Sequence, residues 1–403
     1  MTGPDVAIVG GGPAGAIVAS LLAHAGHEVT VFERSPAYRW RACGVFASPA
    51  TVAALSRIGL DEATLARVTR PIPAMRVETP TGITFRLPYG NGEPVGFDRS
   101  ALDPALEALA VWAGATIRRG TAVEGVDLTD GAPVLRTRSA MGTATLRCRV
   151  VVGADGAHSI VARAAGVARP TLLPERVGLS FHLADPRPDG SDGLHDARLR
   201  VFDGGYVGIA PVPGRRVNIG IVLGPSWRDR LARDGAAVTC GAIVSAVPAT
   251  PDDPATWRDG ELCDHIEGAA PLGGRVTRRA GPGWFLVGDA VGFLDPFTGE
   301  GLHRALVSTE LAAAAIWASF DRPTLAGRAA AAYDRTMRRR FAAKDAVSWL
   351  VQAFLSRPAS FEYAARRLAT RPDVRATMGL VMGDLVPASR GLDPRFLASL
   401  LAP

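Results

Sequence analysis

The sequence predicts an α/β protein in which a domain of strand–helix units is interleaved with an antiparallel β-sheet domain and followed by helices. Three observations indicate this class. Within residues 5–33 a glycine-rich turn joins an apolar strand to a helix, and between about 175 and 225 the apolar residues alternate with a period of two. From about residue 331 they recur instead at the spacing of an α-helix.

The first strand–helix unit has the pattern of a dinucleotide-binding turn. A strand over Val6–Val9 runs into Gly10–Gly15, a helix follows over Ala16–Ala25, and a second strand over Val29–Phe32 ends at Glu33. In such a turn the glycines allow a tight bend, a close approach of a diphosphate to the backbone, and close helix–strand packing. The diphosphate binds free N–H groups at the helix start, and the Glu33 carboxylate can accept hydrogen bonds from ribose hydroxyls.

A second motif lies near residue 290. A strand that begins at Trp284 ends at Gly288-Asp289, whose carboxylate can bond hydroxyl groups of a nucleotide cofactor. Gly299 and Gly301 leave their backbone N–H groups accessible at the start of the next helix. The positive end of that helix can stabilise negative charge, such as that on a reduced flavin.

A third motif completes a family pattern. Asp155-Gly156 follows an apolar strand over residues 147–152, and Arg99 lies at the start of another helix, where a guanidinium suits a phosphate or ribose. Asp155-Gly156 resembles the "DG" fingerprint, and Gly288-Asp289 the "GD" fingerprint, of the p-hydroxybenzoate-hydroxylase-like flavoproteins. The resemblance covers about residues 5–320. That superfamily holds aromatic hydroxylases, epoxidases, flavin halogenases and geranylgeranyl reductases.

The resemblance implies noncovalent FAD, with NAD(P)H as a transient reductant that reaches the flavin along the DG segment. It also implies a set of cofactor-binding residues, which lie in or beside the three motifs and in the loop after the second strand. They are Gly10, Gly12, Pro13, Ala14, Gly15, Glu33, Arg34, Cys43, Gly44, Arg99, Val123, Asp155, Gly156, Gly288, Asp289, Pro296, Gly299, Glu300, Gly301 and Leu302.

The expected organisation follows from these placements. A Rossmann-type FAD-binding domain takes residues 1–70, 96–174 and 271–330, and an antiparallel β-sheet substrate domain takes 71–95 and 175–270. A C-terminal helical region covers 331–403. Its apolar stripe, which includes Val347 and Phe354, is expected to pack on the other two domains.

Two segments help to indicate which branch of the superfamily the chain resembles. Cys43-Gly44 lies in a loop similar to the C-G-x-x-x-S-P loop that passes close to the flavin in reductases and related oxygenases. The segment from Tyr206 to Pro211 is similar to the Y-x-W-x-F-P pattern of geranylgeranyl reductases, but Gly208 and Ala210 replace its second and third aromatic residues. This reshapes the cavity and argues against prenyl reduction.

Flavin halogenases need a lysine in the substrate pocket. Lys344, the single lysine of this chain, lies in the helical tail, so halogenation is disfavoured. For flavin hydroxylation of a phenol, a base near neutral pKa helps, and His182 and His303 are the candidates. For each histidine a structural role is the favoured alternative. Tyr206 and Cys43 complete the set of candidate catalytic residues, with a packing role as the alternative for each.

The favoured function is an NAD(P)H-dependent FAD monooxygenase that hydroxylates or epoxidises an apolar aromatic, quinone or polyketide-like small molecule, in secondary metabolism. The alternative is a geranylgeranyl-reductase-like enzyme that reduces C=C bonds of a prenyl or related apolar substrate. A rival from another class is an FAD-binding accessory protein without turnover.

Composition excludes other classes. The net charge is +6, but the basic residues are dispersed and form no nucleic-acid-binding module. The four cysteines have the spacing of neither a disulfide framework nor a zinc site, and nothing indicates a bound metal. No apolar run is long enough for a membrane span, so a cytoplasmic protein is expected. A monomer and a homodimer both remain open.

Overall fold

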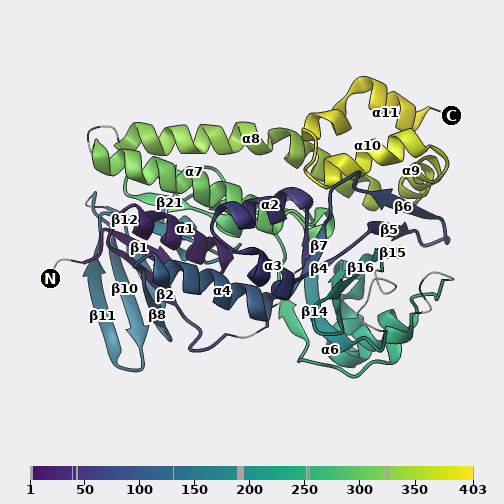
Figure 1. Cartoon of the computed structure of the whole chain (residues 1–403), viewed down its shortest axis with the longest axis horizontal. Helices are drawn as coiled ribbons and strands as arrows, with labels where there is room; N and C mark the ends of the chain where they lie inside the picture. The colour runs from purple at the N-terminus through teal and green to yellow at the C-terminus, as the bar shows by residue number, and fades with distance from the viewer. Residues whose placement is uncertain are drawn as a thin grey trace.

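A mainly parallel sheet forms the first part of the fold (Figure 1). The computed structural model describes residues 3–38, 40–41, 44–129, 131–187, 195–250, 253, 255–322, 324 and 326–402. Within these residues the sheet has six strands, with the antiparallel strand β20 at one edge. In spatial order they are β20 (Ala280–Gly281), β21 (Trp284–Leu286), β12 (Val150–Gly153), β1 (Val6–Val9), β2 (Val29–Glu33) and β8 (Thr116–Arg119).

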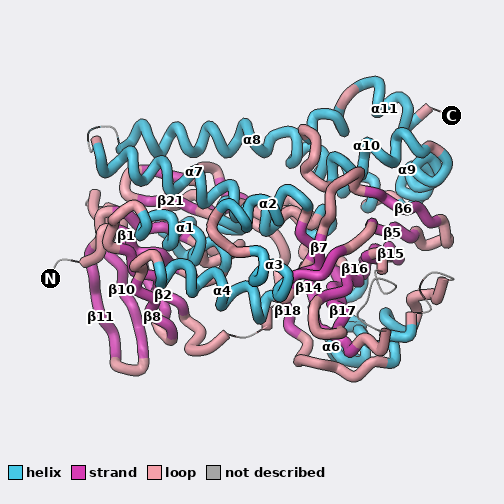
Figure 2. The backbone as a smooth tube through the Cα atoms, in the orientation of Figure 1, coloured by secondary structure: helices cyan, strands magenta, loops and turns pink. Residues whose placement is uncertain are grey.

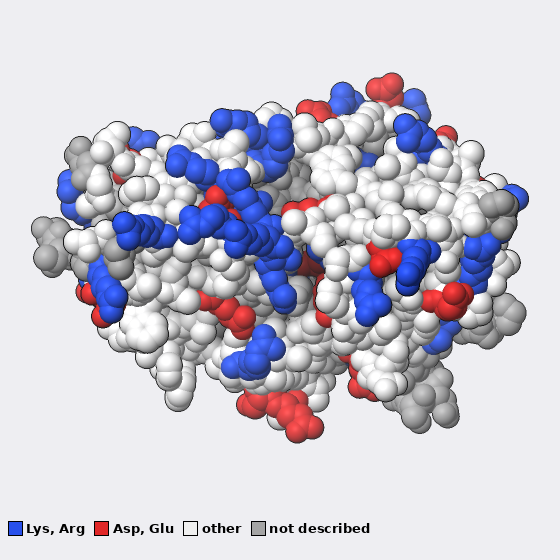
Figure 3. Space-filling model, turned by 90° about the horizontal axis from the view of Figure 1, so that it is seen from above, with Lys and Arg blue, Asp and Glu red and all other residues white. Residues whose placement is uncertain are grey.

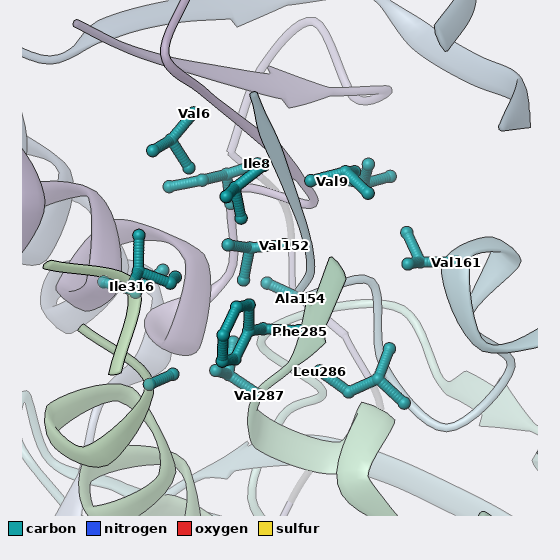
Figure 4. Close-up of a cluster of buried hydrophobic side chains, with 14 of the residues drawn as sticks. Val6, Ile8, Val9, Val152, Ala154, Val161, Phe285, Leu286, Val287 and Ile316 are labelled. Carbon is teal, nitrogen blue, oxygen red and sulfur yellow. The ribbon is translucent and has the colours of Figure 1, made fainter. Parts of the chain in front are cut away.

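The central strands are buried on both faces. Every residue of β1 and β12 is buried, as their unbroken apolar sequences require. The helix α1 (Pro13–His24) follows β1 and begins at Pro13 rather than at Ala16, because extended Gly12 forms its N-cap and proline suits a first helical turn. Figure 4 shows Ile8, Val152 and Phe285 packed together in this core.

A second, mostly antiparallel sheet forms the other part of the fold. Its seven described strands are, in spatial order, β18 (Glu267–Ala269), β14 (Val177–Ala184), β17 (Arg216–Leu223), β16 (Gly205–Val212), β15 (Ala197–Phe202), β5 (Ala74–Glu78) and β6 (Thr84–Pro88). Only the β15–β5 pair is parallel. The fold class expected from the sequence is therefore confirmed.

The two faces of the second sheet differ in character. On β17, Val217, Ile219 and Ile221 pack with the helix α6 (Arg228–Ser245) in a separate apolar cluster. The alternate residues Asn218 and Gly220 lie on the opposite face, since successive side chains of a strand point to opposite sides. The period of two in the sequence reflects this division.

Smaller elements connect and cover the sheets. They are β3 (Phe46–Ala47), α2 (Pro49–Arg57), α3 (Glu62–Val68), β4 (Thr69–Pro71), β7 (Val95–Phe97), α4 (Arg99–Trp112), β9 (Ala122–Asp127), β10 (Val134–Ser139), β11 (Gly142–Arg147), α5 (Ile160–Ala164), β13 (Ala168–Arg169) and β19 (Arg275–Val276).

Helices form the C-terminal part and cover both sheets. The helices α7 (Gly301–Asp321) and α8 (Ala326–Leu355) lie side by side along the first sheet (Figures 1 and 2). They are followed by α9 (Pro358–Thr370), α10 (Pro372–Met382) and α11 (Pro394–Leu401), of which α9 and α10 contact β6.

Part of the expected packing of the apolar stripe is present, because Phe354 and Leu355 pack with the cluster that includes Val77 and Leu87 of the second sheet. Val347 is buried and Phe354 half-buried, whereas Arg338, Arg339 and Arg340 are exposed. In the view from above, basic side chains gather over the half of the molecule that carries α8, with acidic side chains among them (Figure 3). Among the helices described, none combines the length and apolar character that a membrane span requires.

We expect Phe341→Ala to lower the free energy of unfolding by about 3–5 kcal/mol, because it leaves a cavity in the core shared by α8 and the first sheet. Phe341 is 5% exposed. Urea unfolding measures the change. Trp349→Ala, on the same helix at a side chain that is 39% exposed, is the matched control and is expected to cost less than about 1 kcal/mol. Equal costs for the two variants would contradict the packing described.

Candidate functional site

The turn between β1 and α1 forms an open cradle. Gly10 has φ +102°, and a Cβ atom there would lie 2.5 Å from the backbone oxygen of Ala154. A Cβ atom at Gly15 would lie 1.9 Å from the oxygen of Gly10, so only glycine lets the helix approach the strand this closely. At Gly12, by contrast, a Cβ atom would meet no atom within 4 Å. The space before the helix N-terminus is therefore free for a phosphate group.

Glu33 is fixed beside the cradle. Its Oε2 accepts a hydrogen bond of 2.8 Å from the Gly11 amide, and its Oε1 accepts from the Ser35 amide and from Arg41 Nη2, also at 2.8 Å. Burial opposes ionisation of Glu33, but the two amides and the Arg41 charge outweigh it and lower the pKa of the carboxyl group. An ionised carboxylate at this place can accept hydrogen bonds from ribose hydroxyls.

Asp155 ends β12 next to the cradle. Its Oδ2 accepts a hydrogen bond of 2.6 Å from the Ile160 amide at the start of α5. Its Oδ1 is buried and accepts no hydrogen bond from a described residue. Burial raises the pKa of Asp155. Such an orphaned acceptor, together with the open cradle at Gly12, fits a dinucleotide that supplies donors from outside the chain.

The GD motif approaches the same point from β21. A Cβ atom at Gly288 would lie 2.7 Å from the Cβ of Ala14, so the motif packs directly on the start of α1. Asp289 lines the cavity, and burial raises the pKa of its carboxyl group against the lowering effect of the Arg99 charge. Beyond it, Gly299 adopts a left-handed conformation with φ +65° just before α7 begins at Gly301.

These motifs meet at a single continuous cavity of about 520 Å³, which extends from the cradle to the inner face of the second sheet. Most of the expected cofactor-binding residues lie on its wall. They are Gly10, Gly12, Pro13, Ala14, Glu33, Gly44, Arg99, Asp155, Gly156, Gly288, Asp289, Pro296, Gly299, Gly301 and Leu302.

The remaining expected cofactor residues lie elsewhere. Gly15 is buried beneath the turn, Arg34 is exposed, and Val123 packs against the core from β9. The side chain of Glu300 turns to α8, where its Oε1 accepts a hydrogen bond of 3.0 Å from Ser348. Cys43 lies outside the described residues.

The two candidate histidines do not line the cavity. His303 is on the side of α7 that faces Lys344 and Asp384, and burial lowers its pKa. His182 is 1% exposed on β14, and Trp40 packs edge-on against its ring at 4.3 Å.

Tyr206 does line the cavity, but its hydroxyl group is already used. It donates a hydrogen bond of 2.7 Å to Asp295 Oδ1, and Arg176 Nη1 donates one of 2.6 Å to the other oxygen. The Tyr206 ring packs edge-on against Phe297, at 5.0 Å, in the loop that leads to Gly299. Burial raises the pKa of Tyr206 well above its usual value. This side chain holds the loop against the sheet.

Sequence reasoning missed several polar residues of the cavity wall, among them Tyr38, Arg41 and Arg119. The Arg119 guanidinium lies 3.7 Å from the centre of the Tyr38 ring. In the register of the parallel strands β8 and β2, the backbone of Arg119 lies opposite that of Glu33. The register of two parallel strands brings Arg119 to the cavity wall, and no local sequence motif predicts this position. Asn218 also lines the cavity, and a single amide within an apolar strand is a usable signal for it.

We expect Gly12→Val to weaken FAD binding at least about tenfold, or about 1.4 kcal/mol. The valine meets no protein atom, so it excludes the cofactor from the cradle without straining the fold. Equilibrium dialysis of the apoprotein with FAD measures the change. Gly241→Val, on α6 at another position with open space, is the control and should bind FAD normally. Full flavin occupancy in Gly12→Val would contradict the assignment of the cradle.

We expect Glu33→Gln to destabilise the protein near neutral pH and to lose this effect in acid. The folded-state pKa of Glu33 lies below its ordinary value of 4.5, so the stability contributed by its carboxylate is complete above pH 4.5 and lost as the pH falls through the folded-state pKa. Urea unfolding across pH 3–7 should show the difference between wild type and variant shrinking below about pH 4.5. A difference that stays constant would refute the ionised state proposed for Glu33.

Comparison with characterised proteins shows two kinds of relative. Menaquinone reductase of Mycolicibacterium smegmatis is 29% identical over 327 residues, which cover 77% of this chain and 76% of that protein. Digeranylgeranylglycerophospholipid reductase 2 of Methanopyrus kandleri is 29% identical over 330 residues, which cover 76% of this chain and 75% of that protein.

Solved structures share the fold. A geranylgeranyl bacteriochlorophyll reductase-like protein from Thermoplasma acidophilum matches with a TM-score of 0.75 at 21% identity and covers 98% of this chain and 99% of its own. The flavin-dependent halogenase CmlS gives 0.74 at 24%, with 94% and 68% covered. Aklavinone-11 hydroxylase, in complex with FAD and aklavinone, gives 0.65 at 23%, with 80% and 63% covered.

A family model described as an FAD binding domain matches residues 4–310, which is more than half of the chain. The match spans all three motifs that line the cavity, and it confirms both the resemblance seen in the sequence and FAD as the cofactor. The chain thus belongs to this FAD-binding family, within the p-hydroxybenzoate-hydroxylase-like flavoproteins, and is an FAD-dependent oxidoreductase.

Proposed function

We propose that the chain is an NAD(P)H-consuming FAD monooxygenase that hydroxylates or epoxidises a flat, apolar aromatic, quinone or polyketide-like molecule. The observation that carries this proposal is a bare strip of backbone on the inner face of the second sheet. Gly208 on β16 lies directly opposite Gly220 on β17, and both line the cavity.

The strip has room for a ring system. A Cβ atom at Gly208 would have no neighbour nearer than 3.8 Å, and one at Gly220 none nearer than 3.9 Å, so the glycines are not imposed by protein packing. Absence of side chains leaves a flat surface, which we call the glycine shelf. A planar molecule can lie on it with its edge towards the loop from Pro296 to Gly301, where the flavin is expected.

The walls around the shelf are mostly apolar. Apolar side chains from β5, β6 and the loop before α7 complete the cavity, and they include Met75, Val77, Leu87 and Phe297. When bound, FAD would supply the redox chemistry and the reaction with oxygen. A dry cavity protects reactive oxygen-transfer chemistry from hydrolysis, and the start of α7 places positive potential beside the flavin.

The comparisons include a hydroxylase and two kinds of reductase, so they do not fix the reaction. Aklavinone-11 hydroxylase, which shares the fold, is named for the hydroxylation of a small molecule that its structure contains. A second candidate function is reduction of a C=C bond in a quinone or prenyl substrate. It is favoured by the relatives named as menaquinone and digeranylgeranylglycerophospholipid reductases.

One experiment distinguishes the two reactions. The purified holoenzyme is mixed with NADPH or NADH and a panel of hydroxylated naphthalenes, anthraquinones and prenylated quinones under ¹⁸O₂, and the products are analysed by mass spectrometry. A product that carries one labelled oxygen supports the monooxygenase. A product that gains two hydrogens without label supports the reductase, and a flavin that NAD(P)H and the panel never bleach would contradict both.

We expect Gly208→Trp to lower kcat/KM for any flat substrate at least about tenfold, equivalent to about 1.4 kcal/mol, because the indole fills the shelf. FAD content should not change, since Gly208 lies away from the cradle. Steady-state kinetics and the flavin-to-protein ratio give the two readouts. Gly208→Ala fits the space and is the control, with a much smaller effect expected. Unchanged kinetics in Gly208→Trp would remove the shelf from the substrate site.

A further inference from the structure

A chain of polar side chains lies at one end of the glycine shelf, on the inner face of the second sheet. His182 Nδ1 lies 2.6 Å from Asp264 Oδ2, and the Asp264 Oδ1 accepts a hydrogen bond of 2.9 Å from the His182 amide. On the other side of the ring, His182 Nε2 lies 3.4 Å from Asn218 Nδ2. The chain thus runs from the partly exposed Asp264 to Asn218 on the cavity wall.

The protons in this chain have defined places. A carboxylate only accepts hydrogen bonds, so the Asp264 contact puts the imidazole proton on Nδ1 and leaves Nε2 of the neutral ring as an acceptor. Burial lowers the pKa of His182 and outweighs the opposing effect of Asp264, which keeps the ring neutral near pH 7. Nε2 can therefore only accept a hydrogen bond from the Asn218 amide.

This fixes which way the Asn218 amide points. Its Nδ2 also lies 3.2 Å from Ser180 Oγ and 3.4 Å from the Phe181 carbonyl oxygen, and the Ser180 hydroxyl donates its own proton to the Ile219 carbonyl. All three neighbours of the amide nitrogen are acceptors. Turning the amide over would set its oxygen against these acceptors, so the –NH₂ group stays inside the sheet.

The carbonyl oxygen of Asn218 is consequently left for the cavity. No described residue donates a hydrogen bond to Oδ1, and Oδ1 is the nearest atom, at 3.9 Å, to the position that a Cβ of Gly220 would occupy on the shelf. Asn218, Ser180 and Gly220 all line the cavity. An acceptor that faces a mostly apolar cavity is costly unless a bound molecule donates to it.

We propose that Asn218 Oδ1 accepts a hydrogen bond from a hydroxyl group of the substrate, and that the substrate is a hydroxyarene such as a phenol, a naphthol or a hydroquinone. Its ring lies on the glycine shelf, and its apolar remainder extends towards Met75 and Leu87 on β5 and β6. This assignment rests on the proposed function in one respect, namely that the shelf is the substrate site.

His182 and Asp264 act through Asn218 and are positioning residues. Trp40 packs edge-on against the His182 ring and donates its own indole N–H to the Ser180 carbonyl at 3.1 Å. Neither His182 nor Trp40 lines the cavity, so the imidazole acts on a bound molecule only through Asn218. The role of His182 is to accept a hydrogen bond from the Asn218 amide and thereby hold the amide oxygen towards the shelf. This explains a buried His–Asp pair that contacts the cavity only through an amide.

The test compares two probes that differ in one hydrogen-bond donor. Oxidised, FAD-bound enzyme is titrated with 2-naphthol and with 2-methoxynaphthalene, without reductant, and binding is followed by the perturbation of the flavin absorbance spectrum. Wild type should bind 2-naphthol about fivefold to tenfold more tightly, the range that one net hydrogen bond supplies. Equal affinity for the two probes, or no binding of either up to its solubility limit, would overturn the proposal.

Variants assign the preference to the polar chain. Asn218→Leu should bring the ratio of the two affinities to within about twofold. His182→Phe should reduce the preference while the affinity for the methyl ether stays the same, a separation that general loss of structure would not produce. His265→Phe, at an exposed histidine beside Asp264, is the matched control and should behave as wild type.

A preference that survives in Asn218→Leu would also overturn the proposal. Failure here is distinguishable from failure of the proposed function, because binding is measured without turnover. If 2-naphthol is preferred but no labelled oxygen is ever incorporated, the hydroxyl site stands and the monooxygenase assignment falls. If label is incorporated but the preference is missing, the assignment of Asn218 falls alone.

Discussion

The close approach of α1 to β1 is the constraint on which the rest of the site depends. Glycine is required at Gly15 because a Cβ atom would collide with the Gly10 carbonyl oxygen, and at Gly10 because one would collide with Ala154. At Gly288 a Cβ atom would crowd Ala14. The ends of β1, β12 and β21 are thereby drawn to one point at the N-terminus of α1, and three motifs far apart in the sequence become one binding surface.

A second junction, at Asp295, sets the loop before α7 relative to the second sheet. Its carboxylate joins Tyr206 of the sheet to Arg176, and Arg176 also donates a hydrogen bond of 2.7 Å to Gln352 on α8. The backbone amide of Phe297 donates to the same carboxylate at 2.9 Å. The loop is therefore held from three sides, and the C-terminal helices take part in positioning the site as well as in covering it.

The sequence was sufficient for the parts of the site that depend on local backbone geometry. Local sequence patterns predict the turn at Gly10–Gly15, the carboxylate of Glu33 and the GD motif, because each depends on residues that are close together in the sequence. The histidines were misplaced relative to the cavity for a different reason. Alternation identifies the face on which His182 lies, but only the tertiary packing, with Trp40 against its ring, decides that it does not line the cavity. Arg119 escaped notice because strand pairing alone places it near Glu33.

The substrate surface depends on strand register, which local motifs do not encode. Across β14, β17 and β16, one row consists of His182, Asn218 and Ala210, and the next consists of Ser180, Gly220 and Gly208. A slip of β17 by one residue would turn Asn218 and Gly220 towards α6 and bring Ile219 into the cavity. The glycine motifs thus shape the proposed flavin site, whereas the pairing of three antiparallel strands shapes the proposed substrate surface beside it. A family match therefore establishes the cofactor long before it establishes the substrate.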